Sequence, residues 1–367
     1  MSQHSGENVT CNLQPTATAV YDSILLISFG GPEGRDDVIP FLENVLRGRP
    51  VPRERMLEVA EHYYHFGGIS PINDHCRELI TALRKELDGR GVTLPIYWGN
   101  RNWKPMLTDT LREMSATGLR RAIGVVTAAY SSYSSCRQYR ENVQQAQGTV
   151  EGIATQVDKL RVFYNHPLFI SATRDRVAAA LEQIPAVRLA QTHIAYSAHS
   201  IPLSMANQCD YVKQLTESCR LVSELLGIGA ERWKLVYQSR SGRPEDPWLD
   251  PDVNDHLRQL HSSGVTDVVV MPIGFLSDHM EVLFDLDEEA RDTCKQIGLN
   301  MVRAGTVGVH PEFVRMIADL IQERMSNATD RQAIGQFPAN HDVCPVDCCP
   351  PPVIRRPSPS TGAPTRG

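Results

Sequence analysis

The sequence predicts an α/β protein made of two similar doubly wound lobes, each with a parallel sheet. Short apolar runs alternate with segments of helical periodicity, which is typical of strands and helices in βαβ units. A second group of three runs also echoes the first group, either by duplication or by convergence on a common β-loop-α pattern. The first group covers residues 23–29, 94–98 and 121–128, and the second covers residues 193–198, 234–238 and 267–273.

Length and composition set the class of protein. A chain of 367 residues with 41% apolar content can bury a large core in two lobes. The net charge of -6, without a basic stripe interleaved with aromatic residues, predicts no nucleic-acid partner. No segment approaches the roughly 20 continuous apolar residues that span a bilayer, and the first twenty residues hold no apolar signal core. Nine scattered cysteines do not suggest a disulfide framework, so we expect a cytoplasmic protein.

The chain divides into four parts. Residues 1–20 are polar and predict a mobile N-terminal tail, and residues 328–367 predict a second mobile tail rich in Pro and Ser. Between them we expect an N-terminal lobe over residues 21–165 and a C-terminal lobe over residues 166–327. The last helix of the second lobe is expected to pack back on the first lobe.

Two glycines, Gly30 and Gly31, follow the first predicted strand and allow a tight turn of the backbone. The turn has neither the GxGxxG spacing nor the lysine of a phosphate-binding loop, which disfavours nucleotide binding. A turn against a flat ligand and a purely structural turn both fit.

Polar side chains follow two of the predicted strands in the second lobe. His199 comes directly after one strand, and His279 and Glu281 follow another. Ligand sites in open parallel sheets lie beyond the carboxyl ends of the strands. We therefore expect an imidazole and a carboxylate to face one cleft.

Three acids continue from this point at intervals of four residues. In an α-helix Glu281, Asp285 and Glu289 advance by about 40° and roughly 6 Å per step, which makes a slanting ladder of carboxylates. Such a ladder suits the passage of a hard cation. A solvated acidic helix face is the alternative.

An arginine-rich segment lies in the first lobe. It contains Arg47, Arg49, Arg53 and Arg55. Guanidinium groups bind carboxylates in a bidentate fashion, although an isolated cluster is also typical of a solvated surface.

Taken together, the motifs of residues 21–327 resemble the ferrochelatases, which insert ferrous iron into a porphyrin in haem synthesis. The resemblance implies two Rossmann-like lobes around a central porphyrin cleft, as in chelatases, with Fe²⁺ as a substrate. It matches His199 and Glu281 to the catalytic, metal-inserting pair, and Asp285 and Glu289 to outer metal-binding acids. The matching motifs are Phe29-Gly-Gly-Pro32, Phe66-Gly-Gly-Ile-Ser-Pro71, Gly99-Asn-Arg-Asn-Trp103, Ser197-Ala-His-Ser-Ile-Pro202, Tyr237-Gln-Ser-Arg240 with Pro247-Trp248, and residues 272–285.

The chemistry agrees with this assignment. Iron insertion removes two pyrrole N–H protons, so the site needs a proton acceptor beside a flat apolar slot. A neutral imidazole takes up protons near neutral pH, and we assign His199 to that role. Glu281 either accepts the second proton or delivers the iron.

Five residues are predicted to bind the porphyrin: Phe29, Arg47, Arg49, Tyr130 and Trp248. Trp98 is a further aromatic candidate, and aromatic residues at these places are equally ordinary core. Some bacterial ferrochelatases carry tyrosine where this chain has Phe29, and phenylalanine cannot ligate a metal. A mechanism with an axial phenol from this loop is thereby in doubt. A porphyrin or haem carrier that never catalyses insertion is the alternative from another functional class.

The residues expected at the mouth of the cleft indicate which porphyrin is the substrate. Membrane-associated members of the family that use protoporphyrin have an apolar lip at the mouth of the cleft. The corresponding segment of this chain, residues 41–56, is short and rich in arginine. Coproporphyrin has four propionates and protoporphyrin has two, so the arginines favour coproporphyrin III and the product iron-coproporphyrin (coprohaem). The run Tyr130–Tyr139 also resembles the actinobacterial coproporphyrin III ferrochelatases. Protoporphyrin IX, giving haem directly, is the alternative substrate, and insertion of cobalt or nickel into another tetrapyrrole matches the motifs less well. Transient contacts with neighbouring haem-pathway enzymes are a further expectation.

Three cysteines crowd the C-terminal segment. Four thiolates hold a [2Fe–2S] cluster, and many ferrochelatases carry one. By resemblance its ligands are Cys136, Cys344, Cys348 and Cys349. Adjacent residues seldom point two thiolates into one cluster, so Cys209 is an alternative ligand. An unligated, redox-sensitive segment is the other alternative.

Overall fold

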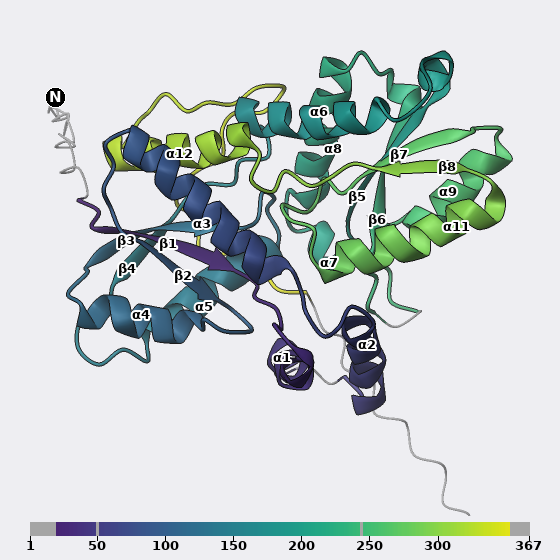
Figure 1. Cartoon of the computed structure of the whole chain (residues 1–367). Helices are drawn as coiled ribbons and strands as arrows, with labels where there is room; N and C mark the ends of the chain where they lie inside the picture. Colours follow the sequence, from purple (N-terminus) through teal and green to yellow (C-terminus); the bar gives the residue numbers. More distant parts are fainter. Residues whose placement is uncertain (1–19, 49–50, 243–244, 353–367) are drawn as a thin grey trace, which may run out of the picture.

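The computed structural model of the chain describes residues 20–48, 51–242 and 245–352, which form two α/β lobes (Figure 1). Each lobe has a four-stranded sheet, with strand order β2-β1-β3-β4 in the first and β6-β5-β7-β8 in the second. All neighbouring strands are parallel. The strand order is the same in both lobes when each is counted from its own first strand. The prediction of two similar parallel α/β lobes is therefore confirmed.

The first lobe contains the strands β1 (Ser23–Ser28), β2 (Ile96–Asn100), β3 (Arg121–Val126) and β4 (Gln156–Lys159). Its α-helices are α1 (Val38–Val45), α2 (Arg53–His65), α3 (Ile72–Gly89), α4 (Leu107–Ala116) and α5 (Gln138–Gln147). A short 3₁₀ helix covers Arg35–Asp37, and a π-helical segment covers Tyr133–Arg137.

The second lobe contains β5 (His193–His199), β6 (Trp233–Gln238), β7 (Asp267–Met271) and β8 (Asn300–Arg303). Its α-helices are α6 (Pro167–Leu181), α7 (Leu203–Ala206), α8 (Tyr211–Leu225), α9 (Val253–Ser262), α10 (Met280–Val282), α11 (Arg291–Ile297) and α12 (Pro311–Ser326). The π-helical segment Leu283–Ala290 joins α10 to α11, and 3₁₀ helices cover Ala186–Gln191 and Ala230–Arg232.

Side chains of the central strands alternate between two apolar layers in each lobe. Ile24 and Leu26 of β1, like Tyr196 of β5, face one central core that the two lobes share. Leu25 and Ile27 face α4 and α5 on the other side of the first sheet. Strands buried on both faces read as continuous apolar runs, which is why β1 and β7 were predictable.

The edge strands β4 and β8 were not predicted from the sequence. Each has four residues, and none of these residues is fully buried. Their sequences, Gln-Val-Asp-Lys and Asn-Met-Val-Arg, mix polar and apolar residues, whereas the other two edge strands, β2 and β6, contain apolar runs that made them predictable. Pairing with a central strand, rather than local sequence, makes them strands.

Helix α12 lies beside α3 and α6 and so connects the lobes (Figure 1). An ion pair of 2.6 Å joins Arg90, at the end of α3, to Asp319 of α12. Arg161, which follows β4, forms another with Glu323 at 2.7 Å. The final helix is thus attached to the first lobe by both apolar packing and ion pairs.

Residues 328–352, here called the C-terminal strap, follow α12 without regular secondary structure. A mobile tail is the expectation for this stretch, and in the structure buried side chains form hydrogen bonds with its backbone. Asn165 donates a hydrogen bond to the carbonyl oxygen of Phe337 at 2.8 Å, and Glu217 accepts one from the N–H of Gln336 at 2.6 Å. The other predicted tail segments, residues 1–19 and 353–367, lie outside the described residues.

The helix that carries the predicted acid ladder differs from the expectation. Residues 280–297 are helical, but Leu283–Ala290 forms a π-helix instead of an α-helix. Its i→i+5 hydrogen bonds widen the turn, so a step of four residues falls short of a full turn, whereas in an α-helix it overshoots. Such π segments often occur at functional sites.

Candidate active site

His199 is the last residue of β5 and faces the space beyond the sheet. Its Nδ1 lies 2.5 Å from the carbonyl oxygen of Ser200. A carbonyl only accepts hydrogen bonds, so Nδ1 carries the proton in the neutral ring and Nε2 keeps its lone pair. The side chain is 34% exposed, which leaves Nε2 accessible for a proton or a metal.

Glu281 reaches this imidazole from the loop after β7. Gly274 in that loop donates its N–H to the carbonyl oxygen of Ser197 at 3.0 Å. A Cβ at Gly274 would lie 2.7 Å from the Cβ of Ala198, so glycine permits the loop to pass against β5. The carboxylate Oε2 of Glu281 then lies 3.8 Å from Nε2 of His199, and the side chain is 45% exposed.

The backbone of Glu281 is fixed from both sides. Its N–H donates to Nδ1 of His279, 3.3 Å away, which makes the half-buried His279 the N-cap of the helix. Its carbonyl oxygen accepts a hydrogen bond from Gln238 at 3.1 Å. Two neighbouring side chains thus hold the backbone that carries Glu281.

Asp285 is held by residues at the end of β6. Gln238 donates to its Oδ2 at 3.2 Å, and the hydroxyl of Ser239 donates to the same oxygen. Gln238 is also the strand partner of His199. One glutamine thus connects the strand of the imidazole with the helix of the acids.

Burial raises the pKa of Asp285 to about 7 from its ordinary value of 3.8. The hydrogen bond from Ser239 opposes that shift, while the charges of Glu281 and Glu289 add to it. The pKa of Glu289 is also raised, chiefly by burial and further by Asp252 and Glu288. Since a cation relieves the repulsion among these carboxylates, the line of acids suits a divalent metal ion.

Helix α2 of the first lobe contacts this part of the second lobe. The rings of His62 and Phe284 stack with centroids 3.8 Å apart. Nε2 of His65 lies 2.7 Å from Oε1 of Glu288. These contacts place α2 beside the π-helical segment that carries the acids.

The predicted porphyrin-binding residues have different surroundings. Phe29 is half-buried against Phe41, and Arg47 donates to the side chain of Asn44. Trp248 forms a bridge with Pro202, in the loop that follows His199. Tyr130 is buried among Phe169 and Tyr211 in the shared core, where it has the surroundings of a packing residue. Arg49 lies outside the described residues.

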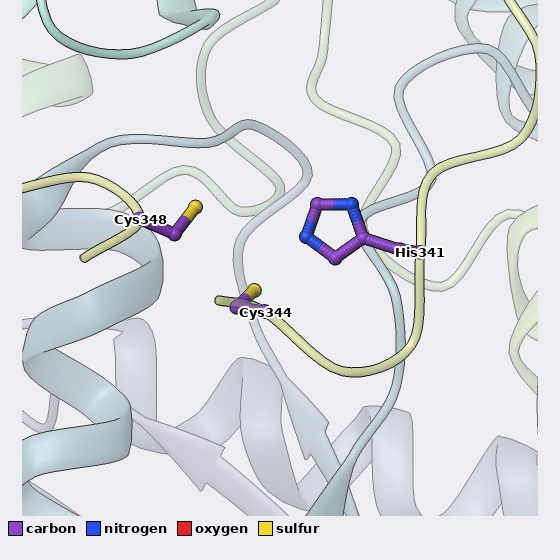
Figure 2. Close-up of side chains that lie close together, drawn as sticks. All are labelled: His341, Cys344 and Cys348. Atoms are coloured by element: carbon purple, nitrogen blue, oxygen red, sulfur yellow. The ribbon is translucent and has the colours of Figure 1, made fainter. Parts of the chain in front are cut away.

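The sulfur atoms of the predicted cluster cysteines form two close pairs, in a part of the chain separate from the acids. Figure 2 shows two of these cysteines, Cys344 and Cys348, beside His341. The sulfur atoms of Cys136 and Cys344 are 4.0 Å apart, and those of Cys348 and Cys349 are 3.5 Å apart. Neighbouring side chains of an extended chain point to opposite sides, but Cys349 has a φ of +52°, in the left-handed region. That backbone conformation accounts for two adjacent thiols that point the same way.

The surroundings of Cys136 favour its thiolate form. The pKa of Cys136 is lowered, mainly by its hydrogen bond with the Cys344 thiol. Burial opposes the shift, and the ammonium group of Lys159, 3.3 Å from the sulfur, adds to it. Burial and the neighbouring Cys348 raise the pKa of Cys349.

Sequence reasoning assigned no role to Gln238 or Ser239, although Gln238 is the last residue of a predicted strand and Ser239 follows it. The rule that selected His199, a polar residue at the carboxyl end of a parallel strand, applies equally to them. Lys159 had no such signal, because only the folded structure brings it to Cys136. His65 and Glu288 are 223 positions apart, and nothing in the sequence indicates their contact.

An imidazole beside a carboxylate, with further acids on the same helical stretch, is an arrangement suited to an enzyme that handles a divalent cation and protons. The ferrochelatase family model matches residues 21–325. A "Ferrochelatase" from Rhodopirellula baltica is 56% identical over 330 residues, which cover 90% of this chain and 93% of that protein. The chain belongs to the ferrochelatase family and is a metal-inserting enzyme.

Other relatives have more specific names. A "Coproporphyrin III ferrochelatase" from Streptomyces coelicolor is 48% identical over 350 residues, which cover 90% of this chain and 93% of that protein. The solved structure of SirB from Bacillus subtilis with Fe3+ has a TM-score of 0.49 and 12% identity, and covers 84% of this chain and 97% of that one. Among the described residues, no helix combines the length and apolar character that crossing a membrane requires.

Proposed function

We propose that this protein inserts ferrous iron into coproporphyrin III and so forms iron-coproporphyrin. The observation that carries the proposal is the distance of 3.8 Å between Nε2 of His199 and the carboxylate of Glu281. Both groups are partly exposed and are mounted on adjacent parallel strands or their loops. The family membership and the name of the Streptomyces relative support the reaction and the porphyrin, respectively.

In this proposal His199 accepts a pyrrole proton at Nε2. The hydrogen bond from Nδ1 to Ser200 keeps that lone pair free in the neutral ring, and it also stabilises the imidazolium that forms. The negative charge of Glu281 then lies beside the new positive charge. Glu281 is thereby suited to stabilise the protonated imidazole, to take the second proton, or to bind the arriving iron.

Asp285 and Glu289 form the route by which iron reaches Glu281. Carboxylate oxygens are ligands that a divalent cation exchanges more readily than thiolates. A pKa of about 7 for Asp285 means that protons and iron compete for this carboxylate near neutral pH. Gln238 and Ser239 are positioning residues in this scheme, because they hold Asp285 in place.

An iron-insertion assay tests directly which porphyrin is the substrate. Purified full-length protein is given ferrous iron without air, together with coproporphyrin III or protoporphyrin IX, and metalloporphyrin formation is followed by absorbance. We expect a higher kcat/KM for coproporphyrin III. A higher value for protoporphyrin IX would overturn the substrate, and tight porphyrin binding without insertion would indicate a carrier.

We further propose that Cys136, Cys344, Cys348 and Cys349 hold a [2Fe–2S] cluster. The sulfurs form two close pairs, at 4.0 Å and 3.5 Å, and two tetrahedral irons need two such pairs. When bound, the cluster would supply a one-electron redox centre and a link between the strap and the first lobe. A protein that is colourless after purification without air, and that contains neither iron nor sulfide, would contradict the cluster.

The cellular location is also part of the proposal. All eight cysteines among the described residues are free thiols, which is typical of a reducing compartment. We therefore place the enzyme in the cytoplasm. Fractionation of cells that contain the full chain, followed by detection in membrane and soluble fractions, tests this placement.

A further inference from the structure

The backbone at the end of β5 is held by the hydroxyl groups of two buried side chains. The hydroxyl of Tyr211, the first residue of α8, donates to the carbonyl oxygen of His199 at 3.1 Å. The hydroxyl of Ser200 donates to the carbonyl oxygen of Leu249 at 2.8 Å. Because Tyr211 and Ser200 are both buried, water competes little for either hydrogen bond.

Backbone hydrogen bonds complete the frame around Ser200. Its N–H donates to the carbonyl oxygen of Gln238 at 2.8 Å, which extends the pairing of β5 with β6 by one residue. The N–H of Leu249 donates to the carbonyl oxygen of Ile201 at 3.0 Å. The peptide groups on either side of the one that contains the Ser200 carbonyl are therefore both held. That carbonyl oxygen lies 2.5 Å from Nδ1 of His199, so its direction sets the direction of the imidazole.

We propose that Ser200 and Tyr211 are positioning residues, which hold the imidazole of His199 with a proton on Nδ1 and the lone pair of Nε2 facing the cleft. This inference rests on the proposed role of His199 as the proton acceptor. A neutral imidazole has two tautomers, and the hydrogen bond at one nitrogen decides which of them is populated. If the Ser200 carbonyl turns away, the ring is free to carry its proton on Nε2, where it no longer accepts one from the porphyrin.

Other buried hydroxyl groups in the same part of the fold provide matched controls. Tyr196, in the middle of β5, is fully buried, and its hydroxyl lies 2.9 Å from that of Ser223 in α8. Ser218 of α8 is also fully buried and donates to the carbonyl oxygen of Tyr164 at 2.7 Å. These hydrogen bonds match the proposed ones in burial and length, but they do not involve the peptide groups around Ser200. Tyr196→Phe and Ser218→Ala are therefore the controls.

Iron insertion into coproporphyrin III by the full-length protein measures the effect on the rate. Tyr211→Phe and Ser200→Ala should each lower kcat by roughly fivefold, the value of one neutral hydrogen bond, without a comparable change in the KM for porphyrin. The two control variants should keep the kcat of the wild-type protein. Far-ultraviolet circular dichroism shows whether each variant is folded.

The tautomer of His199 is a second measurement, and it does not need iron insertion. Long-range nitrogen–proton correlation spectra of protein labelled with ¹⁵N in its histidines distinguish rings with a proton on Nδ1 from rings with a proton on Nε2. The spectra are recorded at a pH at which the ring is neutral, and His199→Ala assigns the signal. We expect only the Nδ1–H form of His199 in the wild-type protein and the controls. Tyr211→Phe and Ser200→Ala should each add a signal of the Nε2–H form.

Two results would overturn the positioning role. One is a kcat for Tyr211→Phe and Ser200→Ala that equals the kcat of the controls. The other is a lower kcat while His199 keeps only the Nδ1–H form, because the hydroxyl groups would then act by a route other than the tautomer. A wild-type protein that inserts no iron, while both variants show the change of tautomer, would reject the proposed enzymatic function and support the positioning role.

Discussion

Both lobes have a π-helical segment at the same point of the fold, but the segments carry different metal-donor side chains. A π-helical segment follows the third strand of each sheet: Tyr133–Arg137 after β3 and Leu283–Ala290 after β7. The first carries Cys136, which is 4% exposed. The second carries Asp285 and begins two residues after Glu281, whose side chain is 45% exposed.

In the proposed function, this difference separates residues that retain a metal from residues that pass one on. Buried thiolates form strong bonds to soft or borderline metal ions and have little access to water, so they suit an ion or cluster that stays. Carboxylates and an accessible imidazole exchange their ligands more easily, so they suit an ion that moves on. The repeated fold places donor side chains after the third strand of each sheet. The chemistry of those side chains determines whether a metal ion is retained or passed on.

The largest expected effect comes from the acid beside the imidazole. Glu281→Gln removes the negative charge that faces His199 while it keeps the size of the side chain. We expect kcat for iron insertion to fall by about 10²- to 10⁴-fold, the range typical of a lost acid–base group. Glu288→Gln, on the same helical stretch but paired with His65, is the matched control. Equal losses in the two variants would remove the distinction between the reacting acid and its neighbours.

A smaller effect, with a distinct pH signature, is expected for Asp285→Asn. The carboxyl pKa of about 7 in the folded protein exceeds its ordinary value of 3.8, so the folded state binds a proton that the unfolded state releases. Asp285 therefore lowers stability as pH rises from about 4 to about 7. The variant should gain roughly 1 to 3 kcal/mol of unfolding free energy at pH 8 and little at pH 4.

The same substitution should raise the KM for ferrous iron by about tenfold, because the iron route loses one carboxylate. Denaturant unfolding at the two pH values measures the stability, and initial rates at varied iron measure the KM. A lower unfolding free energy of the variant at pH 8 would show that the ionised carboxylate of Asp285 does not destabilise the folded protein.

The first lobe is expected to affect porphyrin affinity more than chemistry. Arg47→Ala should raise the KM for coproporphyrin III by about fivefold with little change in kcat, since a solvated charge pair contributes on the order of 1 kcal/mol. Arg112→Ala, at an exposed arginine of α4, is the control. Initial rates at varied porphyrin concentration distinguish the two kinetic effects, and a fall in kcat alone would place Arg47 in the chemical step.

The smallest effect is expected where the lobes touch. His65→Ala removes the contact with Glu288, and this pair is largely exposed. The loss of unfolding free energy should not exceed about 1 kcal/mol, and it should decrease at high salt. Thermal unfolding at low and high salt measures it. A loss of several kcal/mol would show that α2 is an essential support of the acidic segment.

The sequence predicted the central strands and the edge strands β2 and β6, and it singled out His199 and Glu281 as candidate site residues, because each has a local signal. Continuous apolar runs mark strands that are buried on both faces, and polar residues at the ends of those runs mark the site. The edge strands β4 and β8 have no such run. The π-helical turn that carries Asp285 was also missed, since the residue spacing alone fits an α-helix equally well.

The strap shows a second limit of sequence reasoning. Its Pro-rich, aperiodic sequence predicts no regular structure, and none is found in residues 328–352. Yet the side chains of Asn165 and Glu217, far away in the chain, pair with its backbone and fix its course. Local composition predicts the absence of helices and strands, but it does not predict whether buried partners hold a segment in place.

The central claim is that the imidazole of His199 takes protons from the porphyrin at the site where Glu281 receives iron. The most direct test compares the wild-type protein with His199→Ala in anaerobic iron insertion into coproporphyrin III, with porphyrin binding measured in parallel by fluorescence quenching. His193→Ala, at the opposite end of the same strand, serves as the control. We predict that His199→Ala binds porphyrin normally but inserts iron at least about 100-fold more slowly. Insertion at the wild-type rate by His199→Ala would contradict the account.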